Sequence, residues 1–520
     1  MHLRAKRLTA KYRAPKMFLL PNPINRQRFR SAPGTLSPPQ SISSHYMTLT
    51  LPTISLPKVL IILCLTVLIR GVSAPGYGQV GAEPERERLL NGLRLLIRHR
   101  PGDQDVLLKL RIHSGAAFDM AGKAGQMAIL GDILFPDAST REYFTEEMGG
   151  RLDVDTDYDS ITVTLQGRAR EFERIVEILR TALVATQVTP ENVARIRDGR
   201  VKIAKETNVS PALWADRAIA ARLFGDFPYG RPQTGSAESL GRVDRADLMH
   251  ARERFLNSNN ATLVVSGGVP KNRAMRALRQ LLGPWRKSEQ IVPTTFRQPE
   301  APDVRTLIVN VPADQGAEVR LATRGVSRSD RDFATGVILA MVARKRWVTL
   351  SPELSRRPVF VRNEPHVLPG IFVMGAAVDS LLVGKTLKTA HDVLQSLVSG
   401  PVPAGELEEA KSEASAQFTK ELETPDGTAR AWLDIDTFGL PSISEQLAAF
   451  SAVSAADLQR VATLLFEKTR TATVVIGNSQ QLKAMLEPNV KLELMGELEK
   501  PQPDKTGVKP TTTIPVKKPD

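Results

Sequence analysis

Two halves of this chain of 520 residues repeat each other at a nearly constant spacing. A strand-like segment that ends at Gly115 matches one that ends at Gly325, 210 positions later. Two valine-rich segments, 261–267 and 472–477, end at the same spacing. A repeat of this length predicts two similar folded units, because each copy carries the same order of apolar segments. Further pairs at this spacing are Val243 with Val453, Asp247 with Asp457 and Leu248 with Leu458.

In the middle of each half the spacing rises to 214 positions, where Val188 matches Val402 and Pro211 matches Pro425. One inserted loop and one deleted loop explain a shift that later reverses. Each half reads as a strand, helices, further strands, a long amphipathic helix pair, shorter helices and a closing strand. This pattern predicts an α+β fold, with long helices on one face of a mainly antiparallel sheet. The predicted helix pairs span 170–206 and 385–422, and the mid-half strands span 163–166 and 370–375.

Composition and the repeat together divide the chain into segments. A Pro-containing stretch with few periodic apolar positions separates the two halves and reads as a linker, and the C-terminal end is rich in Lys, Pro and Thr. The expected boundaries are a basic disordered leader that precedes Met47, 1–46; a signal peptide or membrane anchor, 47–82; a first domain, 84–286; the linker, 287–303; a second domain, 304–490; and a disordered tail, 491–520.

The formal charge of +14 first suggests a nucleic-acid partner. Residues 1–82, however, hold eleven basic and no acidic residues, so the folded region carries only +3. Together with the low aromatic content, this predicts no nucleic acid among the partners. The single cysteine, Cys64, lies before the folded region, which therefore has no disulfide and no thiolate ligand or nucleophile.

An apolar run at residues 59–69 has the length of a signal-peptide core and is shorter than a membrane-spanning helix. Small residues at Ala74 and Ala82 have the spacing that a signal peptidase reads. Pro75 disfavours cleavage after Ala74, so membrane attachment through residues 59–69 stays open as an alternative. Either way, we expect the folded region outside the cytoplasm, in the periplasm or anchored to the membrane and facing it.

Several motifs resemble the M16 (pitrilysin or insulinase-type) metallopeptidases. Asn91-Gly92-Leu93 is similar to that family's opening turn, and Pro228-Tyr229-Gly230-Arg231-Pro232 to its Pro-Tyr-Gly-x-Pro signature. Gly149-Gly150 with Thr156 and Asp159 is similar to its Gly-Gly-x-x-Asn-Ala-x-Thr-x-x-Asp strand, except that Asp153 replaces the Asn. The resemblance covers residues 84 to about 490. It implies two duplicated M16-like α/β-roll domains and a zinc cofactor.

The zinc ligands and the general base that this resemblance implies are missing. The family's helix reads Gly-x-Ala-His-x-x-Glu-His-x-x-Phe, and here Ala128, Gly131 and Asp132 stand at the two His and the Glu. The third ligand, a Glu eight residues before a Pro, corresponds to Ile203. A zinc peptidase needs imidazole ligands and a carboxylate base at such positions. We therefore expect no catalytic residues, no metal site and no bound cofactor, and a helix at 121–135 that serves for packing.

No other residues replace these ligands in the sequence. The histidines after residue 82 are too widely spaced for a helical metal pair. The acidic series Asp153, Asp155, Asp157 and Asp159 alternates along a predicted strand from Leu152 to Leu165, and a solvated strand face explains it better than a calcium loop. In the second half, the family's substrate-gripping Arg and Tyr correspond to Glu353 and Phe360. Phe360 has no hydroxyl group, and Arg356 or Arg357 could stand in for the Arg.

Three functions remain open at this point. The first is a non-catalytic subunit, with a catalytically active M16 subunit and extended peptide as partners. The peptide would lie along an edge strand that includes Asp153, Thr156 and Asp159. The second is an active zinc metalloendopeptidase with relocated ligands. The third is an envelope scaffold or adaptor without a peptidase partner.

Overall fold

The computed structural model describes residues 83–207, 210–289, 296–297, 299–311, 316–486 and 490–495, without the side chains of residues 355 and 356. The predicted leader, the signal peptide or anchor, and the tail beyond residue 495 lie outside these ranges.

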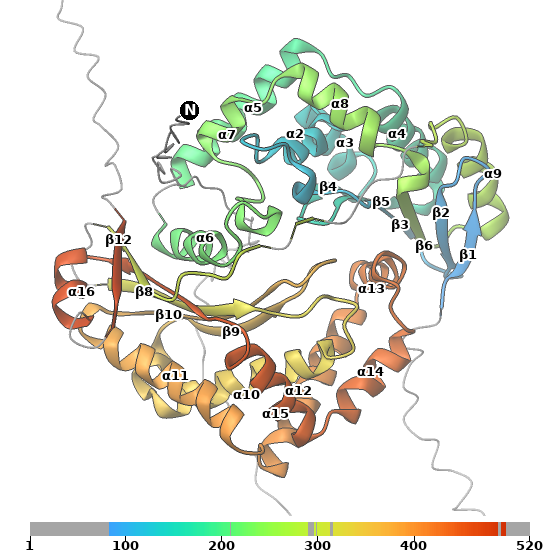
Figure 1. Cartoon of the computed structure of the whole chain (residues 1–520). Helices are drawn as coiled ribbons and strands as arrows, with labels where there is room; N and C mark the ends of the chain where they lie inside the picture. The colour runs from blue at the N-terminus through green and yellow to red at the C-terminus, as the bar shows by residue number, and fades with distance from the viewer. Residues whose placement is uncertain are drawn as a thin grey trace, which may run out of the picture. The chain divides into compact units, whose positions relative to one another are not determined.

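Two six-stranded sheets form the framework of the described chain (Figure 1). The first sheet has the order β1-β2-β6-β3-β5-β4, and the second has the order β12-β7-β11-β8-β10-β9. Most neighbouring strands are antiparallel, while β2 with β6, β11 with β7 and β12 with β7 are parallel. The strands are β1 (Glu85–Arg88), β2 (Arg94–His99), β3 (Asp105–Ile112), β4 (Arg151–Thr156), β5 (Ile161–Arg168), β6 (Ala261–Gly267), β7 (Thr306–Asn310), β8 (Gly316–Arg324), β9 (Val359–Glu364), β10 (Ile371–Asp379), β11 (Ala472–Gly477) and β12 (Leu492–Met495).

The two sheets have the same topology over five strands, which confirms the predicted duplication. In order across the sheet, β2, β6, β3, β5 and β4 correspond to β7, β11, β8, β10 and β9. The sixth strand differs, because β1 opens the first half whereas β12 closes the second. The predicted α+β class and its mainly antiparallel sheets are therefore correct.

Long helices cover the outer face of each sheet, as the amphipathic pattern predicts. In α4, the buried residues Phe172, Ile175, Val176 and Leu179 recur at helical spacing and join the first core. The first half contains α2 (Gln126–Ile133), α3 (Ala138–Glu146), α4 (Phe172–Val184), α5 (Pro190–Thr207), α6 (Pro211–Phe224), α7 (Ala237–Gly241), α8 (Arg245–Phe255) and α9 (Lys271–Leu282). The second contains α10 (Phe333–Leu350), α11 (Val383–Ser399), α12 (Ala404–Leu422), α13 (Pro425–Phe438), α14 (Ile443–Ala452), α15 (Ala455–Phe466) and α16 (Ser479–Leu486).

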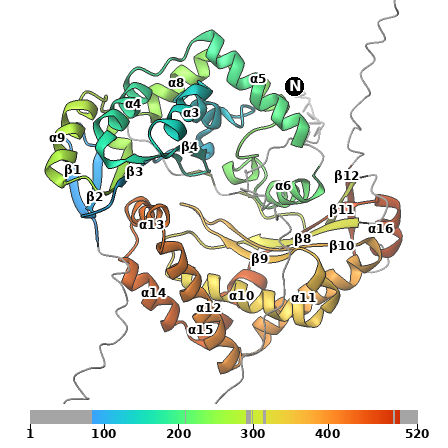
Figure 2. The same ribbon diagram turned by 180° about the vertical axis from the view of Figure 1, so that it is seen from behind.

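The inner face of each sheet is covered by a helix of the other half. Helix α6 of the first half packs on β8 and β11, and helix α13 of the second half packs on β3 and β6. Both helices lie between the two sheets in Figures 1 and 2. The sequence boundaries of the two domains therefore do not separate two independent cores.

Side chains of alternate residues on the central strands point to opposite faces of the sheet. On β6, Leu263 and Val265 join the outer core, while Val264 packs with Trp432 and Leu433 of α13. Val475 of β11 likewise faces outward, and its two neighbours pack against α6. Because both faces are covered, the central strands read as continuous apolar runs.

Strand β12 corrects one predicted boundary. It pairs in parallel with β7, with Leu492 opposite Thr306 and Met495 opposite Val309. The second domain therefore extends through Met495, and residues 491–495 do not belong to a disordered tail. The strand was missed because its four residues, Leu-Glu-Leu-Met, are too few to show a period and adjoin a Lys- and Pro-rich stretch.

Candidate functional site

Helix α2 is fixed at its N-terminus by a buried carboxylate. The backbone N–H groups of Gly125 and Met127 donate to the two oxygens of Asp119, at 2.6 and 2.7 Å. Burial raises the pKa of Asp119 to about 7, and the two backbone donors act against this shift. Gly125 itself adopts φ 92°, where a Cβ atom would lie 2.7 Å from the carbonyl oxygen of Thr234. This close approach joins the start of α2 to the loop after the Pro-Tyr-Gly motif.

The positions that would carry zinc chemistry are filled by packing. Ala128 is fully buried in α2. A Cβ atom on Gly131 would lie 3.0 Å from the Thr156 hydroxyl and 3.3 Å from a methyl carbon of Val154, so the helix lies tightly on β4. Ile203 of α5 is half exposed and offers only an alkyl chain. These three residues cannot ligate a metal ion.

The Asp132 carboxylate is not a free metal ligand, because it already forms an ion pair. The Nε atom of Arg200, on α5, donates to its carboxylate at 2.6 Å, and both side chains are largely shielded from water. The guanidinium is permanently charged. A cation therefore stands beside the one potential ligand, and the residues present do not fit a zinc ion.

Sequence comparison of ligand positions did not find Arg200. The signal was present, since Arg200 lies three residues before Ile203 on a helix and so shares its face. Only the packing of α5 against α2 shows that it meets Asp132. Throughout the described ranges, no group of three or more His, Cys, Asp or Glu side chains is placed to hold a metal ion.

Strand β4 is the open edge of the first sheet, and its acidic residues are not equivalent. The predicted strand from Leu152 to Leu165 is in fact a hairpin, because it breaks at the turn 157–160 between β4 and β5. Asp153 and Asp155 are exposed on β4, as expected for a solvated face. Asp157 and Asp159, in the turn, are shielded, so that expectation is wrong for them.

The turn holds the two shielded carboxylates by hydrogen bonds. Asp157 accepts from the backbone N–H groups of Asp159 and Ser160, at 2.7 and 2.6 Å. Burial, and then the neighbouring Asp159, raise the pKa of Asp157. Both interactions are local features that alternation along a strand does not reveal, since Asp favours turns for its backbone-like hydrogen bonding.

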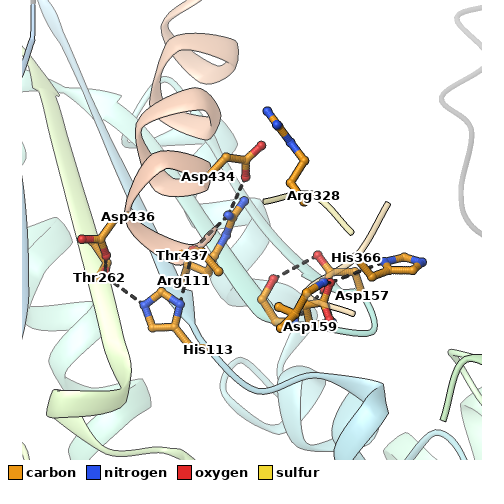
Figure 3. A network of polar contacts seen from close by, with 12 residues as sticks. Arg111, His113, Asp157, Asp159, Thr262, Arg328, His366, Asp434, Asp436 and Thr437 are labelled. Carbon is orange, nitrogen blue, oxygen red and sulfur yellow. Dashed lines mark hydrogen bonds and ion pairs between the residues drawn. The ribbon is translucent and has the colours of Figure 1, made fainter. Parts of the chain in front are cut away.

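Asp159 connects the turn to the second half of the chain. It accepts from the Tyr229 hydroxyl at 3.1 Å and from the Val367 backbone N–H at 3.0 Å, and His366 lies 3.4 Å away. Figure 3 shows Asp159 and His366 side by side. Burial raises the pKa of Tyr229. Asp159 and Tyr229, both motif residues, therefore dock the β9–β10 turn, and Asp159 is not open to a peptide as predicted for the edge strand.

A second polar network joins α13 to the first sheet (Figure 3). Arg111 donates to Asp434 at 2.6 Å, and Thr262 donates to Asp436 at 2.5 Å. Arg94 donates to Nε2 of His113 at 2.7 Å, which leaves Nδ1 of that ring protonated toward Thr437. Nearby, Lys109 pairs with Asp426 at 2.7 Å.

His113 is enclosed in this network as a neutral ring. Burial, followed by the charges of Arg94 and Arg111, lowers its pKa to about 3. The network is structural, since it lies beneath α13 and holds the two halves together.

The substrate-gripping positions of the second half also have structural partners. Glu353, in the 3-10 helix η5 (Pro352–Arg356), pairs with Lys385 at 3.0 Å. The Phe360 ring lies against Gly375 and between the guanidinium groups of Arg320 and Arg362, at 4.9 and 3.9 Å. Arg357 forms an ion pair with Asp379 instead of standing in for the missing Arg.

Two family models match the sequence. "Insulinase (Peptidase family M16)" matches residues 94–235, and "Peptidase M16 inactive domain" matches residues 242–346. Among solved structures, a protease from Helicobacter pylori has a TM-score of 0.70 at 17% identity, covering 76% of this chain and 99% of its own. A peptidase M16 inactive domain from Pseudomonas fluorescens has a TM-score of 0.68 at 16% identity, covering 76% and 98%.

Curated relatives match over less of their length. Mitochondrial-processing peptidase subunit beta of Neurospora crassa is 21% identical over 52% of this chain and 58% of its own. An uncharacterized zinc protease of Mycobacterium leprae is 24% identical over 38% of this chain and 46% of its own. The chain thus spans about half the length of the curated relatives it matches.

The duplicated sheets and the helices that cover them define a two-domain α+β chain with the fold of these neighbours. Sequence and fold agree: the chain resembles the M16 (insulinase-type) peptidases, as the sequence motifs predicted, and M16 models match its residues 94–235 and 242–346. It departs from the active pattern at Ala128, Gly131, Asp132 and Ile203. No helix in the described ranges has the length and apolar character needed to cross a membrane.

Proposed function

We propose that this chain is a non-catalytic M16 subunit that binds extended peptide along β4 and completes a peptidase chamber with a catalytically active M16 subunit. The observation that carries the proposal is the Asp132–Arg200 ion pair, which stands beside an open strand edge. The scaffold for peptide binding is kept, while the ligand positions hold an alanine, a glycine, an isoleucine and a paired carboxylate. Binding is therefore the role that these residues support best.

The open edge of β4 has the backbone groups that an added strand needs. The N–H and C=O groups of Leu152 and Val154 point away from β5, and within the described ranges they bind no other backbone group. An extended peptide pairs with such an edge through its main chain, largely independently of sequence. The exposed Asp153 and Asp155 side chains favour cationic residues in the peptide.

Relatives support a role within an assembly. One is named as subunit beta of the mitochondrial-processing peptidase, and human cytochrome b-c1 complex subunit 1 matches at 21% identity over 41% of this chain and 45% of its own. A chain that lacks zinc ligands can contribute to proteolysis only in a complex with a chain that has them. The sequence of residues 47–82 supports an assembly outside the cytoplasm, with a cleaved signal peptide or with attachment through residues 59–69.

The peptide-binding part is tested with one edge variant. Val154→Pro removes an N–H group that points to the open edge and leaves the hydrogen bonds to β5 intact. We expect the variant to lose binding of a pool of short, fluorescent random-sequence peptides, measured by anisotropy, while its circular dichroism is unchanged. Val154→Ala, which loses the same side-chain packing but keeps the N–H group, is the matched control. Equal binding by the Val154→Pro variant and the parent would overturn the β4 assignment.

The partner part is tested by mixing. The purified full chain is combined with the product of a neighbouring M16 gene that keeps His-x-x-Glu-His, and sedimentation velocity is measured. We expect a heteromeric species and altered peptidase activity. Separate species with unchanged activity support the alternative of an envelope scaffold without a peptidase partner.

Metal content separates the proposal from an active enzyme with relocated ligands. We expect less than about 0.1 zinc per chain after mild dialysis, because no described carboxylate or imidazole set offers the usual four-coordinate site. One zinc per chain, with peptidase activity that a chelator removes, would favour the relocated-ligand alternative instead.

A further inference from the structure

The open edge of β4 is closed at one end. The Nε2 atom of Gln233 donates to the carbonyl oxygen of Thr156 at 2.7 Å. That oxygen is the last acceptor on the open side of β4, so it is not available to an added strand. The edge therefore offers free backbone groups at Leu152 and Val154 and is blocked at Thr156.

The register of the hairpin establishes which groups face outward. The N–H of Asp157 donates to the carbonyl oxygen of Ser160 at 3.0 Å, so these two residues form a hydrogen-bonded pair. Antiparallel pairs alternate between bonded and non-bonded types. Asp155 and Asp153 therefore bind β5, while Thr156, Val154 and Leu152 present their backbone groups to the open side.

Gln233 is held firmly in its blocking position. Its loop closes a turn in which the N–H of Gly235 donates to the carbonyl oxygen of Pro232 at 2.9 Å. Gly235, with φ 83°, lies so close to the start of α2 that a Cβ atom would be 2.4 Å from the carbonyl oxygen of Ala124. A peptide that pairs with Leu152 and Val154 cannot displace this loop without moving α2, so the peptide must end or turn away near Thr156.

Arg200 supplies charge near this closed end. A Cβ atom on Gly131, the residue before Asp132, would lie 3.0 Å from the Thr156 hydroxyl, so the part of α2 that holds the Asp132–Arg200 pair packs on the end of β4. Arg200 uses Nε for Asp132. No residue in the described ranges bonds its two terminal nitrogens, which leaves a donor pair for an anion.

Resting on the proposed peptide-binding function, we infer that Arg200 and the closed end of β4 form a site for the C-terminal carboxylate of the bound peptide. A guanidinium binds a carboxylate through two parallel N–H donors. The peptide runs parallel to β4, with its last residue near Thr156. The ligand class is thus a peptide with a free C-terminus, such as a cleavage product, and not an internal segment of a longer chain.

The opposite end of the strand provides the competing arrangement. A peptide antiparallel to β4 would place its carboxylate near Arg151 and its amino group near Thr156. Arg151 already pairs with Asp153 at 3.0 Å and with Asp426 at 3.1 Å, so its charge is satisfied by two carboxylates. Arg200 has one carboxylate in ion-pair contact, Asp132, and its charge acts on the buried Asp119 only from beyond that distance, so it is the better anchor.

The test compares one extended peptide as its free acid, its C-terminal amide and its N-acetylated form, by isothermal titration with the full chain. We expect the free acid to bind about tenfold or more tightly than the amide, in line with a hydrogen bond between charged groups, and acetylation to have no effect. Arg200→Gln removes the preference for the free acid. Arg200→Lys, which keeps the charge but not the fork, retains part of it, and Arg151→Gln leaves it unchanged.

The outcomes separate this inference from the proposed function. Equal binding of acid and amide, with binding still lost in Val154→Pro, overturns the carboxylate site and leaves the peptide edge standing. A preference that disappears in Arg151→Gln overturns the parallel orientation and the assignment to Arg200. No binding of any form overturns both.

Discussion

At the scale of single residues, one ion pair determines whether α2, the helix at the family's zinc-binding position, can hold a metal ion. Asp132 occupies a ligand position, but Arg200 neutralises it from α5 at 2.6 Å. Their side chains are 28% and 19% exposed, so the pair is partly shielded from solvent screening. Removing one partner leaves the other charge in a site that no longer compensates it.

A double-mutant cycle measures this pair. We expect Asp132→Asn and Arg200→Gln each to lower the free energy of unfolding by about 1–2 kcal/mol, with a coupling energy of about 1 kcal/mol. Urea denaturation gives these values. The pair Arg195–Asp137, with side chains 52% and 66% exposed, is the matched control and should show coupling near zero. Equal coupling energies in the two cycles would contradict the inference that the Asp132–Arg200 pair is shielded from solvent screening.

His113 makes stability depend on pH. Its pKa is lowered to about 3 in the folded chain, below the usual value near 6.5, so the unfolded chain takes up a proton first. The contribution of the neutral ring is present above about pH 6.5 and is lost as pH falls toward about 3, by up to about 1.4 kcal/mol per pH unit.

We expect His113→Asn to flatten this acid loss of stability, measured as urea midpoints at several pH values between 7 and 4. Comparing the variant with the parent separates the contribution of His113 to the pH dependence of stability from that of Asp119, which both proteins contain. The pKa of Asp119 is raised to about 7, so its contribution is present at low pH and is lost as pH rises toward 7. Parallel pH profiles for the two proteins would show that His113 does not titrate in this window.

At the scale of elements, the contact between α2 and β4 has no room for the family's glutamate. A Cβ atom on Gly131 would lie 3.0 Å from the Thr156 hydroxyl and 3.3 Å from a methyl carbon of Val154. Even a Cβ atom there needs these side chains to give way slightly, a glutamate needs far more space, and overpacking of this kind costs about 1–3 kcal/mol.

We expect Gly131→Glu to destabilise the chain by about 2 kcal/mol or more, measured by urea denaturation. Gly199→Ala on α5 is the control, because a Cβ atom there meets nothing within 4 Å. That change should stabilise by about 0.5–1 kcal/mol through helix propensity. An unaffected Gly131→Glu variant would mean that the helix moves away from β4 at little cost.

At the scale of the whole molecule, the exchange of α6 and α13 makes the two halves depend on each other. Trp432 of α13 is 2% exposed and packs against Leu96 and Leu107 of the first sheet. Trp214 of α6 packs in the same way on the second sheet. Each sheet would expose an apolar inner face if the other half unfolded.

We therefore expect one cooperative unfolding transition, with hydrogen exchange in β3 and β8 reporting the same free energy. Trp432→Ala, on the second half, should lower the stability reported by β3 of the first half by about 3–5 kcal/mol. Exchange that weakens only in the second half would contradict the shared core.

The sequence by itself determined the duplication, the α+β class, the resemblance to M16 peptidases and the residues that stand at the zinc-ligand positions. These follow from residue identity and spacing, which one chain displays directly. It located the long helices and the central strands because apolar periodicity is local. It misjudged Asp157 and Asp159, because a turn inside a predicted strand changes the direction of every side chain after it.

Only the tertiary structure shows which contacts are made by the residues at the zinc-ligand and motif positions. The Asp132–Arg200 pair joins residues 68 positions apart, and the Asp159–Tyr229–Val367 contacts join two halves of the chain. The cover of each sheet by the other half's helix is likewise invisible in sequence, since α6 and α13 read as ordinary amphipathic helices. The sequence shows which groups are present, whereas long-range packing alone decides which of them meet, because each contact depends on where whole helices and strands are placed.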